Sequence, residues 1–94
     1  MRLEELTIDV SGILDDQTLH EYLFKVLQFP GYYGFNFDAL WDCISCDEQS
    51  VMPQRLIVKG MSELKQASPD TYALFMECLK DYQKEFPDRE LRFF

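Results

Sequence analysis

The chain has 94 residues, 47% of them hydrophobic, and its 17 acidic and 9 basic residues give a formal net charge of −8. This length predicts a single domain, residues 1–94, with a modest core. The negative charge argues against direct nucleic-acid binding, because phosphate backbones would be repelled, and it favours a basic protein partner.

Compartment and membrane signals follow from the same pattern. No apolar run approaches the roughly 18 residues that a membrane span requires, and the N-terminus MRLEELTIDV is unlike a signal peptide. Three cysteines without a secretory signal predict reduced thiols. We therefore expect a cytoplasmic protein that makes no membrane contact.

The first half of the chain predicts a strand and two helices. Residues 3–10 alternate in polarity and end at Ser11-Gly12, which indicates a strand followed by a turn. Asp15 or Asp16 can then cap a helix with one apolar stripe. The stripe comprises Leu19, Tyr22, Leu23, Val26 and Leu27. His20, the single histidine, is expected on the surface of this helix.

After a loop broken by Pro30-Gly31 and Gly34, Asn36 can cap a second, short helix. Its apolar face comprises Phe37, Leu40, Trp41 and Ile44. Residues 47–53 are expected to form a polar loop.

The second half predicts two more strands and two more helices. Leu56-Ile57-Val58 is typical of a buried parallel strand, residues 61–67 predict a short helix, and Ser68-Pro69 is a strong helix start. The inward face of this long helix comprises Tyr72, Phe75, Met76, Leu79 and Tyr82. Residues 90–94 predict a last strand. Strands separated by helices predict an α/β fold, a small three-stranded parallel sheet packed against helices.

The segment YYGFNFDALWDC, residues 32–43, mixes aromatic rings with carboxylates. Asp38, Asp42 and Ser45 share the outward side of the second helix. The helix dipole explains Asp38 well, but it favours Asp42 little, and Trp41 beside it is expected at the edge of the core. Glu77 and Asp81 form a second pair at the same spacing on the long helix. Single exposed acids usually have no function, whereas two pairs beside Tyr and Trp indicate a protein interface.

This segment resembles the signature of the barstar-like family of ribonuclease inhibitors. The matching residues are Tyr32, Tyr33, Gly34, Asn36, Asp38, Ala39, Leu40, Trp41, Asp42 and Cys43. The order of elements also fits the family's small parallel-sheet fold. The resemblance implies an inhibitor, or immunity protein, that binds a basic ribonuclease or toxin domain. It implies no enzyme activity, no catalytic residue, no cofactor and no metal, and we expect the free protein to be a monomer.

The resemblance also implies which residues face the ribonuclease. They are Tyr32, Asn36, Asp38, Trp41 and Asp42, joined by Glu77 from the long helix. Asp42 would enter the nuclease active site and meet the cationic groups that normally hold substrate phosphate. We add Ser45 because it shares the outward side of the short helix.

The chain departs from the family at three places. Phe35 stands where the inhibitor of barnase has an acidic residue, Cys46 replaces a glycine, and the 47–53 segment is longer. These differences concern the choice of partner, which could be another ribonuclease or a toxin domain of another kind.

The same residues allow four other interpretations. Cys43-Ile-Ser-Cys46 is a C-x-x-C motif, but it follows the helix start too late for a stabilised thiolate. A zinc site would need Cys78 and His20, which lie on different predicted helices, and paired carboxylates at 38 and 42 lack the rest of an enzyme site. An acidic interaction module for a basic partner that is not a nuclease would use the same residues.

Overall fold

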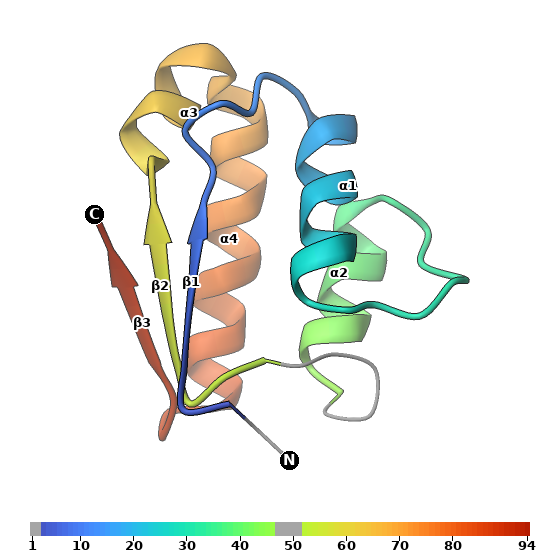
Figure 1. Ribbon diagram of the computed structural model, residues 1–94, viewed down its shortest axis with the longest axis vertical. Helices are drawn as coiled ribbons and strands as arrows, with labels where there is room; N and C mark the ends of the chain where they lie inside the picture. The colour runs from blue at the N-terminus through green and yellow to red at the C-terminus, as the bar shows by residue number, and fades with distance from the viewer. Residues whose placement is uncertain (1–2, 47–51) are drawn as a thin grey trace.

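The computed structural model describes residues 3–46 and 52–94, so residues 47–51 of the predicted polar loop lie outside the described part (Figure 1). Within these two ranges, three strands and four helices follow in this order: β1 (Glu5–Asp9), α1 (Asp16–Val26), α2 (Phe37–Ile44), β2 (Arg55–Lys59), α3 (Met61–Ala67), α4 (Pro69–Glu85) and β3 (Glu90–Phe93).

The strands form one parallel sheet in the order β1-β2-β3, which confirms the α/β prediction. Leu6, Leu56 and Leu91 lie side by side in register across the three strands. Helices α1 and α2 connect β1 to β2, and α3 and α4 connect β2 to β3, since neighbouring parallel strands require a crossover.

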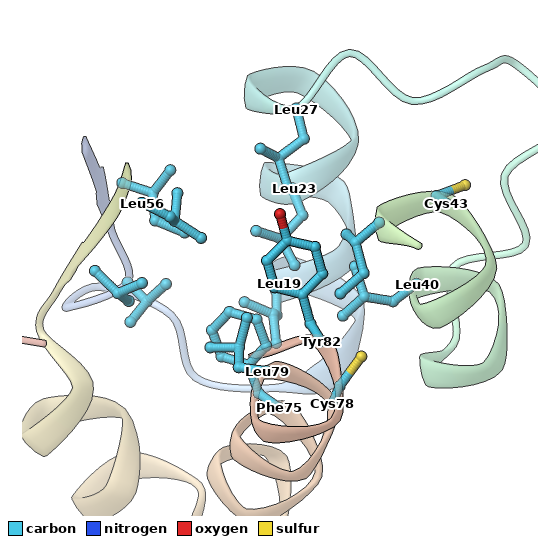
Figure 2. Packing of buried hydrophobic residues seen from close by; sticks show 14 of the residues in the cluster. Leu19, Leu23, Leu27, Leu40, Cys43, Leu56, Phe75, Cys78, Leu79 and Tyr82 are labelled. Carbon is cyan, nitrogen blue, oxygen red and sulfur yellow. The ribbon is translucent and has the colours of Figure 1, made fainter. Parts of the chain in front are cut away.

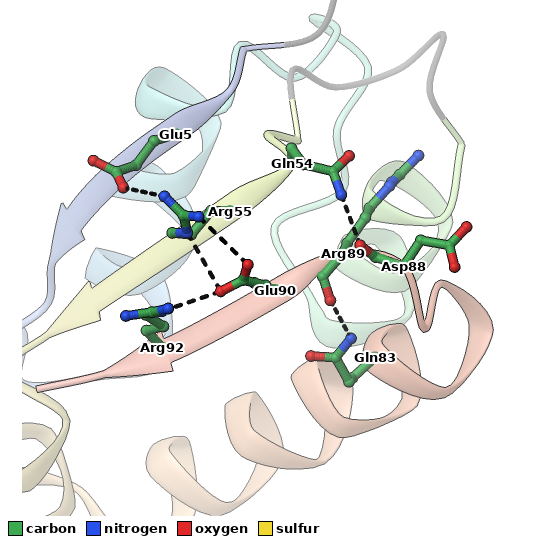
Figure 3. A network of polar contacts seen from close by, with 8 residues as sticks. All are labelled: Glu5, Gln54, Arg55, Gln83, Asp88, Arg89, Glu90 and Arg92. Atoms are coloured by element: carbon green, nitrogen blue, oxygen red, sulfur yellow. Dashed lines mark hydrogen bonds and ion pairs between the residues drawn. The ribbon is translucent and has the colours of Figure 1, made fainter.

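Helices cover one face of the sheet, with α4 next to β1 and partly behind it in Figure 1. Ile8, Leu56 and Val58 are buried on this face. In the described residues the opposite face carries a charged network, in which Arg55 Nη1 lies 3.1 Å from Glu5 Oε1 and Arg55 Nε lies 3.3 Å from Glu90 Oε2 (Figure 3). The prediction of a fully buried strand is therefore wrong for Ile57, which is half-buried on the open face.

The core lies between the sheet and the helices (Figure 2). From α1 it receives Leu19 and Leu23, each 0% exposed, and from α2 it receives Leu40, which is 1% exposed. Helix α4 contributes the predicted Phe75, Leu79 and Tyr82, and also Cys78 and Thr71. Burying such apolar side chains is worth about 1.5–3 kcal/mol each, and this packing fixes α2 against α4.

The helices begin where the sequence predicts, but the Ser68 cap lacks the expected hydrogen bond to the backbone. Asp15 caps α1, because its carboxylate accepts a hydrogen bond from the Thr18 N–H at 2.8 Å. Ser68 stands at the N-cap position of α4, but its hydroxyl donates to Thr71 Oγ1 at 2.7 Å and does not accept from the backbone. Thr71 in turn donates to the Asp16 carboxylate, which links α4 to α1. The Ser68 hydroxyl therefore donates the first of two linked side-chain hydrogen bonds, the second of which reaches α1.

Within residues 3–46 and 52–94, no helix is both long and apolar enough to cross a membrane.

Candidate functional site

Helix α2 carries the candidate site, and its first turn is held by Asn36. The side-chain oxygen of Asn36 accepts a hydrogen bond from the Ala39 N–H at 2.7 Å, as predicted. Its amide also donates to the Gly34 carbonyl at 3.2 Å, so the same side chain joins the preceding loop to the helix. Below this turn Leu40 and Ile44 are each 1% exposed, and Asp38 and Asp42 are exposed on the other side.

A groove runs between α2 and α4. It is lined by Phe37, Asp38, Trp41, Leu74, Glu77, Cys78 and Asp81. Three carboxylates, one from α2 and two from α4, thus meet beside the half-buried ring of Trp41. Such a groove is suited to a cationic side chain with an apolar stem, since the rings exclude water while the carboxylates attract the charge.

A second groove lies on the loop side of α2. It is lined by Tyr32, Tyr33, Gly34, Ala39, Asp42, Cys43 and Ser45. Tyr32 is 74% exposed and Asp42 is exposed, whereas the Ser45 hydroxyl donates to the Trp41 carbonyl at 2.6 Å. Asp38 and Asp42 both point outward, as the spacing predicted, but each opens into a different groove.

Tyr33 anchors the loop that carries Tyr32. It is 4% exposed, and its ring centroid lies 4.7 Å from that of Phe29 and 5.1 Å from that of Phe35. Phe35 has a φ of 52°, a left-handed conformation that is uncommon for a bulky residue and that this packing must hold in place. The aromatic cluster therefore fixes the direction in which the chain enters α2.

His20 corrects the expectation of a surface residue, because it is 1% exposed. Its Nδ1 lies 2.6 Å from the Tyr33 hydroxyl, and its ring meets the edge of Phe37 at a centroid distance of 4.6 Å. Burial lowers the pKa of His20 below its ordinary value of 6.5, and the carboxylate of Asp16 opposes that change only in part. The loop covers the helix face that carries His20, and local spacing in α1 could not reveal this.

Cys43 and Cys78 have the electrostatics of structural thiols. Cys43 is 3% exposed, and burial raises its pKa, which is the opposite of what a redox-active cysteine requires. Burial also raises the pKa of Cys78, to about 12. None of the three cysteines is in a disulfide. Across the described ranges no three His, Cys, Asp or Glu side chains gather in a way that could hold a metal ion.

Six of the seven candidate residues line one of the two grooves. We call the seven together the acidic face: Tyr32, Asn36, Asp38, Trp41, Asp42, Ser45 and Glu77. Asn36 lines neither groove and is the cap of α2. The structure adds Asp81 and the exposed Leu74, which share the α2–α4 groove with Glu77. The four-residue spacing of Glu77 and Asp81 in the sequence indicated Asp81. Nothing in the sequence indicated Leu74, which is a leucine outside the inward stripe of α4.

Comparison with known proteins identifies a family and a relative. Residues 3–94 match the model of the family described as Barstar (barnase inhibitor). A Bacillus subtilis (strain 168) protein named "Putative ribonuclease inhibitor YrdF" is 32% identical over 87 residues, which cover 92% of each chain. The family match spans nearly the whole chain, and the chain belongs to the barstar (barnase inhibitor) family.

Proposed function

We propose that this protein is an inhibitor, acting as an immunity protein, that binds a basic barnase-like ribonuclease or a related toxin domain and covers its active site. Membership of the barstar family and the relative named as a ribonuclease inhibitor support this role. The structural observation that carries it is the pair of grooves beside α2, in which carboxylates stand next to aromatic rings.

The mechanism follows from the chemistry of the target. A ribonuclease active site is concave and basic because it must hold phosphate. Asp42 offers a carboxylate where the phosphate would bind, and it has no bond that the nuclease could cleave. Tyr32, beside it and largely exposed, would be covered in the complex and would shield the charge pair from water. An ion pair excluded from water is stronger and dissociates more slowly.

The second groove gives the complex a second anchor. Asp38, Glu77 and Asp81 would together receive another cationic side chain of the partner, with its stem against Trp41. Two charged anchors on opposite sides of one helix fix the orientation of the partner as well as its affinity. The net charge of −8 would draw a basic partner in from a distance, an effect that salt screens. We propose further that the protein acts as a monomer in the cytoplasm of the cell it protects.

The test is RNA cleavage by a barnase-type nuclease with the purified protein titrated in. We expect stoichiometric inhibition by the parent and a strong loss in Asp42→Ala, since removing one partner of a buried charge pair costs about 2–5 kcal/mol. This range includes values for the barnase–barstar complex itself.

Glu63→Ala is the matched control, because it removes the same charge from an exposed position in α3, away from both grooves. Inhibition that survives Asp42→Ala unchanged would rule out phosphate mimicry. A folded protein that inhibits no nuclease of this type would favour a basic partner that is not a nuclease.

A further inference from the structure

We propose that His20 and Tyr33 form a pH-sensitive latch: protonation of His20 releases the loop of residues 30–35 from α1 and disorganises the acidic face. The effect on binding rests on the proposed function, whereas the release of the loop is a property of the protein alone.

His20 lies where α1 meets the loop of residues 30–35 and the start of α2, and the last two carry most of the acidic face. The imidazole belongs to α1, its Nδ1 is 2.6 Å from the Tyr33 hydroxyl in the loop, and its ring contacts Phe37, the first residue of α2. His20 and Tyr33 are 1% and 4% exposed, so water cannot replace this hydrogen bond while the loop is closed.

Protonation changes what the imidazole can do. Neutral imidazole has one donor and one acceptor nitrogen, so it can accept a hydrogen bond from the Tyr33 hydroxyl, whereas imidazolium has two donors and a full charge. A charge in this aromatic surrounding is costly unless it is paired, so opening the loop to water becomes favourable.

The surrounding groups supply little compensation. On α1 the carboxylate of Asp16 favours the charged form, but it is also engaged by the Thr71 hydroxyl of α4. Burial raises the pKa of the thiols of Cys43 in α2 and Cys78 in α4, so they stay neutral and supply no negative charge. Burial outweighs Asp16, and the pKa of His20 is lowered accordingly.

The sign of the effect follows. A base whose pKa is lower in the folded than in the unfolded state binds fewer protons when folded. The closed latch therefore contributes its full stability above pH 6.5, the ordinary value, and loses it as pH falls below that value towards the folded pKa.

Opening this latch would change the groove of Asp42 and the cap of α2. Tyr33 is flanked by Tyr32, which lines the groove of Asp42, and by Gly34, whose carbonyl accepts the hydrogen bond from Asn36. A displaced loop would therefore move Tyr32 away from Asp42 and loosen the cap of α2 at the same time.

The first experiment uses the free protein. Because His20 is the single histidine, its ring signals in an NMR titration from pH 8 to pH 4.5 report its protonation directly. We expect a midpoint below 6.5, and the amide signals of residues 32–35 should shift with the same midpoint while those of β2 and α3 do not. The proposal would be overturned if the loop amide signals do not shift as His20 titrates, or if the His20 midpoint lies at or above pH 6.5. So would simultaneous changes throughout the chain, because these would indicate global unfolding.

Two variants separate titration from structure. His20→Asn keeps a polar group near the position of Nδ1 but cannot be protonated, so the pH response of the loop should disappear. Tyr33→Phe keeps the ring and removes the hydroxyl, so the amides of residues 32–35 should exchange at least fivefold faster than in the parent at pH 8. If His20→Asn does not fold, the Tyr33→Phe result decides alone, and unchanged exchange in that variant would refute the latch.

The second experiment measures inhibition of a barnase-type nuclease at pH 7.5 and pH 5.0. The parent should lose at least fivefold more affinity between these values than His20→Asn, a comparison that cancels the nuclease's own pH dependence. Equal losses in the two proteins would show that the latch does not control binding. If neither protein inhibits at any pH, the proposed function fails, and the NMR titration still decides whether the latch exists.

Discussion

Replacing Asn36 by alanine tests how far the acidic face depends on the way α2 is held. Asn36 makes two hydrogen bonds within the protein, accepting from the Ala39 N–H at 2.7 Å and donating to the Gly34 carbonyl at 3.2 Å. The family resemblance implies that Asn36 also faces the partner. A loss of affinity in Asn36→Ala could therefore arise from a lost contact or from a loosened helix.

The two hydrogen bonds of Asn36 set the expected cost of the loosened helix. Loss of an N-cap side chain costs about 1 kcal/mol, and loss of an exposed hydrogen bond to a loop carbonyl adds about 0.5 kcal/mol. Together these predict a decrease of about 1.5 kcal/mol in the free energy of unfolding. For a domain of this size that corresponds to about 6–12 °C in Tm.

Asn36→Asp is the matched variant, since a carboxylate keeps the cap on Ala39 and gains from the helix dipole while losing the amide donor. We expect its stability to lie within about 0.5 kcal/mol of the parent. Urea unfolding of all three proteins, followed by circular dichroism, measures these differences. If the alanine variant unfolds at the same urea concentration as the parent, the cap does not hold α2 and the reasoning is wrong.

Two further predictions concern buried thiols and backbone geometry. With Ellman's reagent the native protein should react quickly at Cys46 alone, while Cys43 and Cys78, 3% and 6% exposed, should react only in urea; fast labelling of Cys43 would contradict its burial. Gly60→Ala should destabilise the fold by at least about 2 kcal/mol, because φ is 83° and a Cβ would lie 2.5 Å from a backbone nitrogen of the β1–α1 connection. Gly12→Ala, where a Cβ meets nothing within 4 Å, is the control in thermal unfolding and should change Tm little.

Features set by short-range patterns were predictable. The apolar stripe of α1 and the caps at Asp15 and Asn36 depend on residues within a few positions of one another, and the structure confirms them. The parallel sheet followed from strands separated by helices. The outward direction of Asp38 and Asp42 followed from the helical period alone.

Features set by distant segments were not predictable. Whether His20 is covered depends on where a loop ten or more positions later folds back. Whether Ile57 is buried depends on which face of the sheet the helices cover. The two separate grooves exist because α4 lies on one side of α2 and the loop on the other. No window of sequence around Asp38 or Asp42 contains that information.

The acidic face is supported from outside the helix that carries most of it. Helix α2 has eight residues, fewer than an isolated helix needs to be stable in water, so its shape depends on what surrounds it. Leu40 fixes it to the core, Asn36 fixes its first turn, and the cluster around Tyr33 and Phe35 fixes the entering loop. Because side chains that are already ordered lose little entropy on binding, these supports contribute to affinity without touching a partner. Substitutions in them should therefore lower affinity while the choice of partner, set by the exposed carboxylates, stays the same.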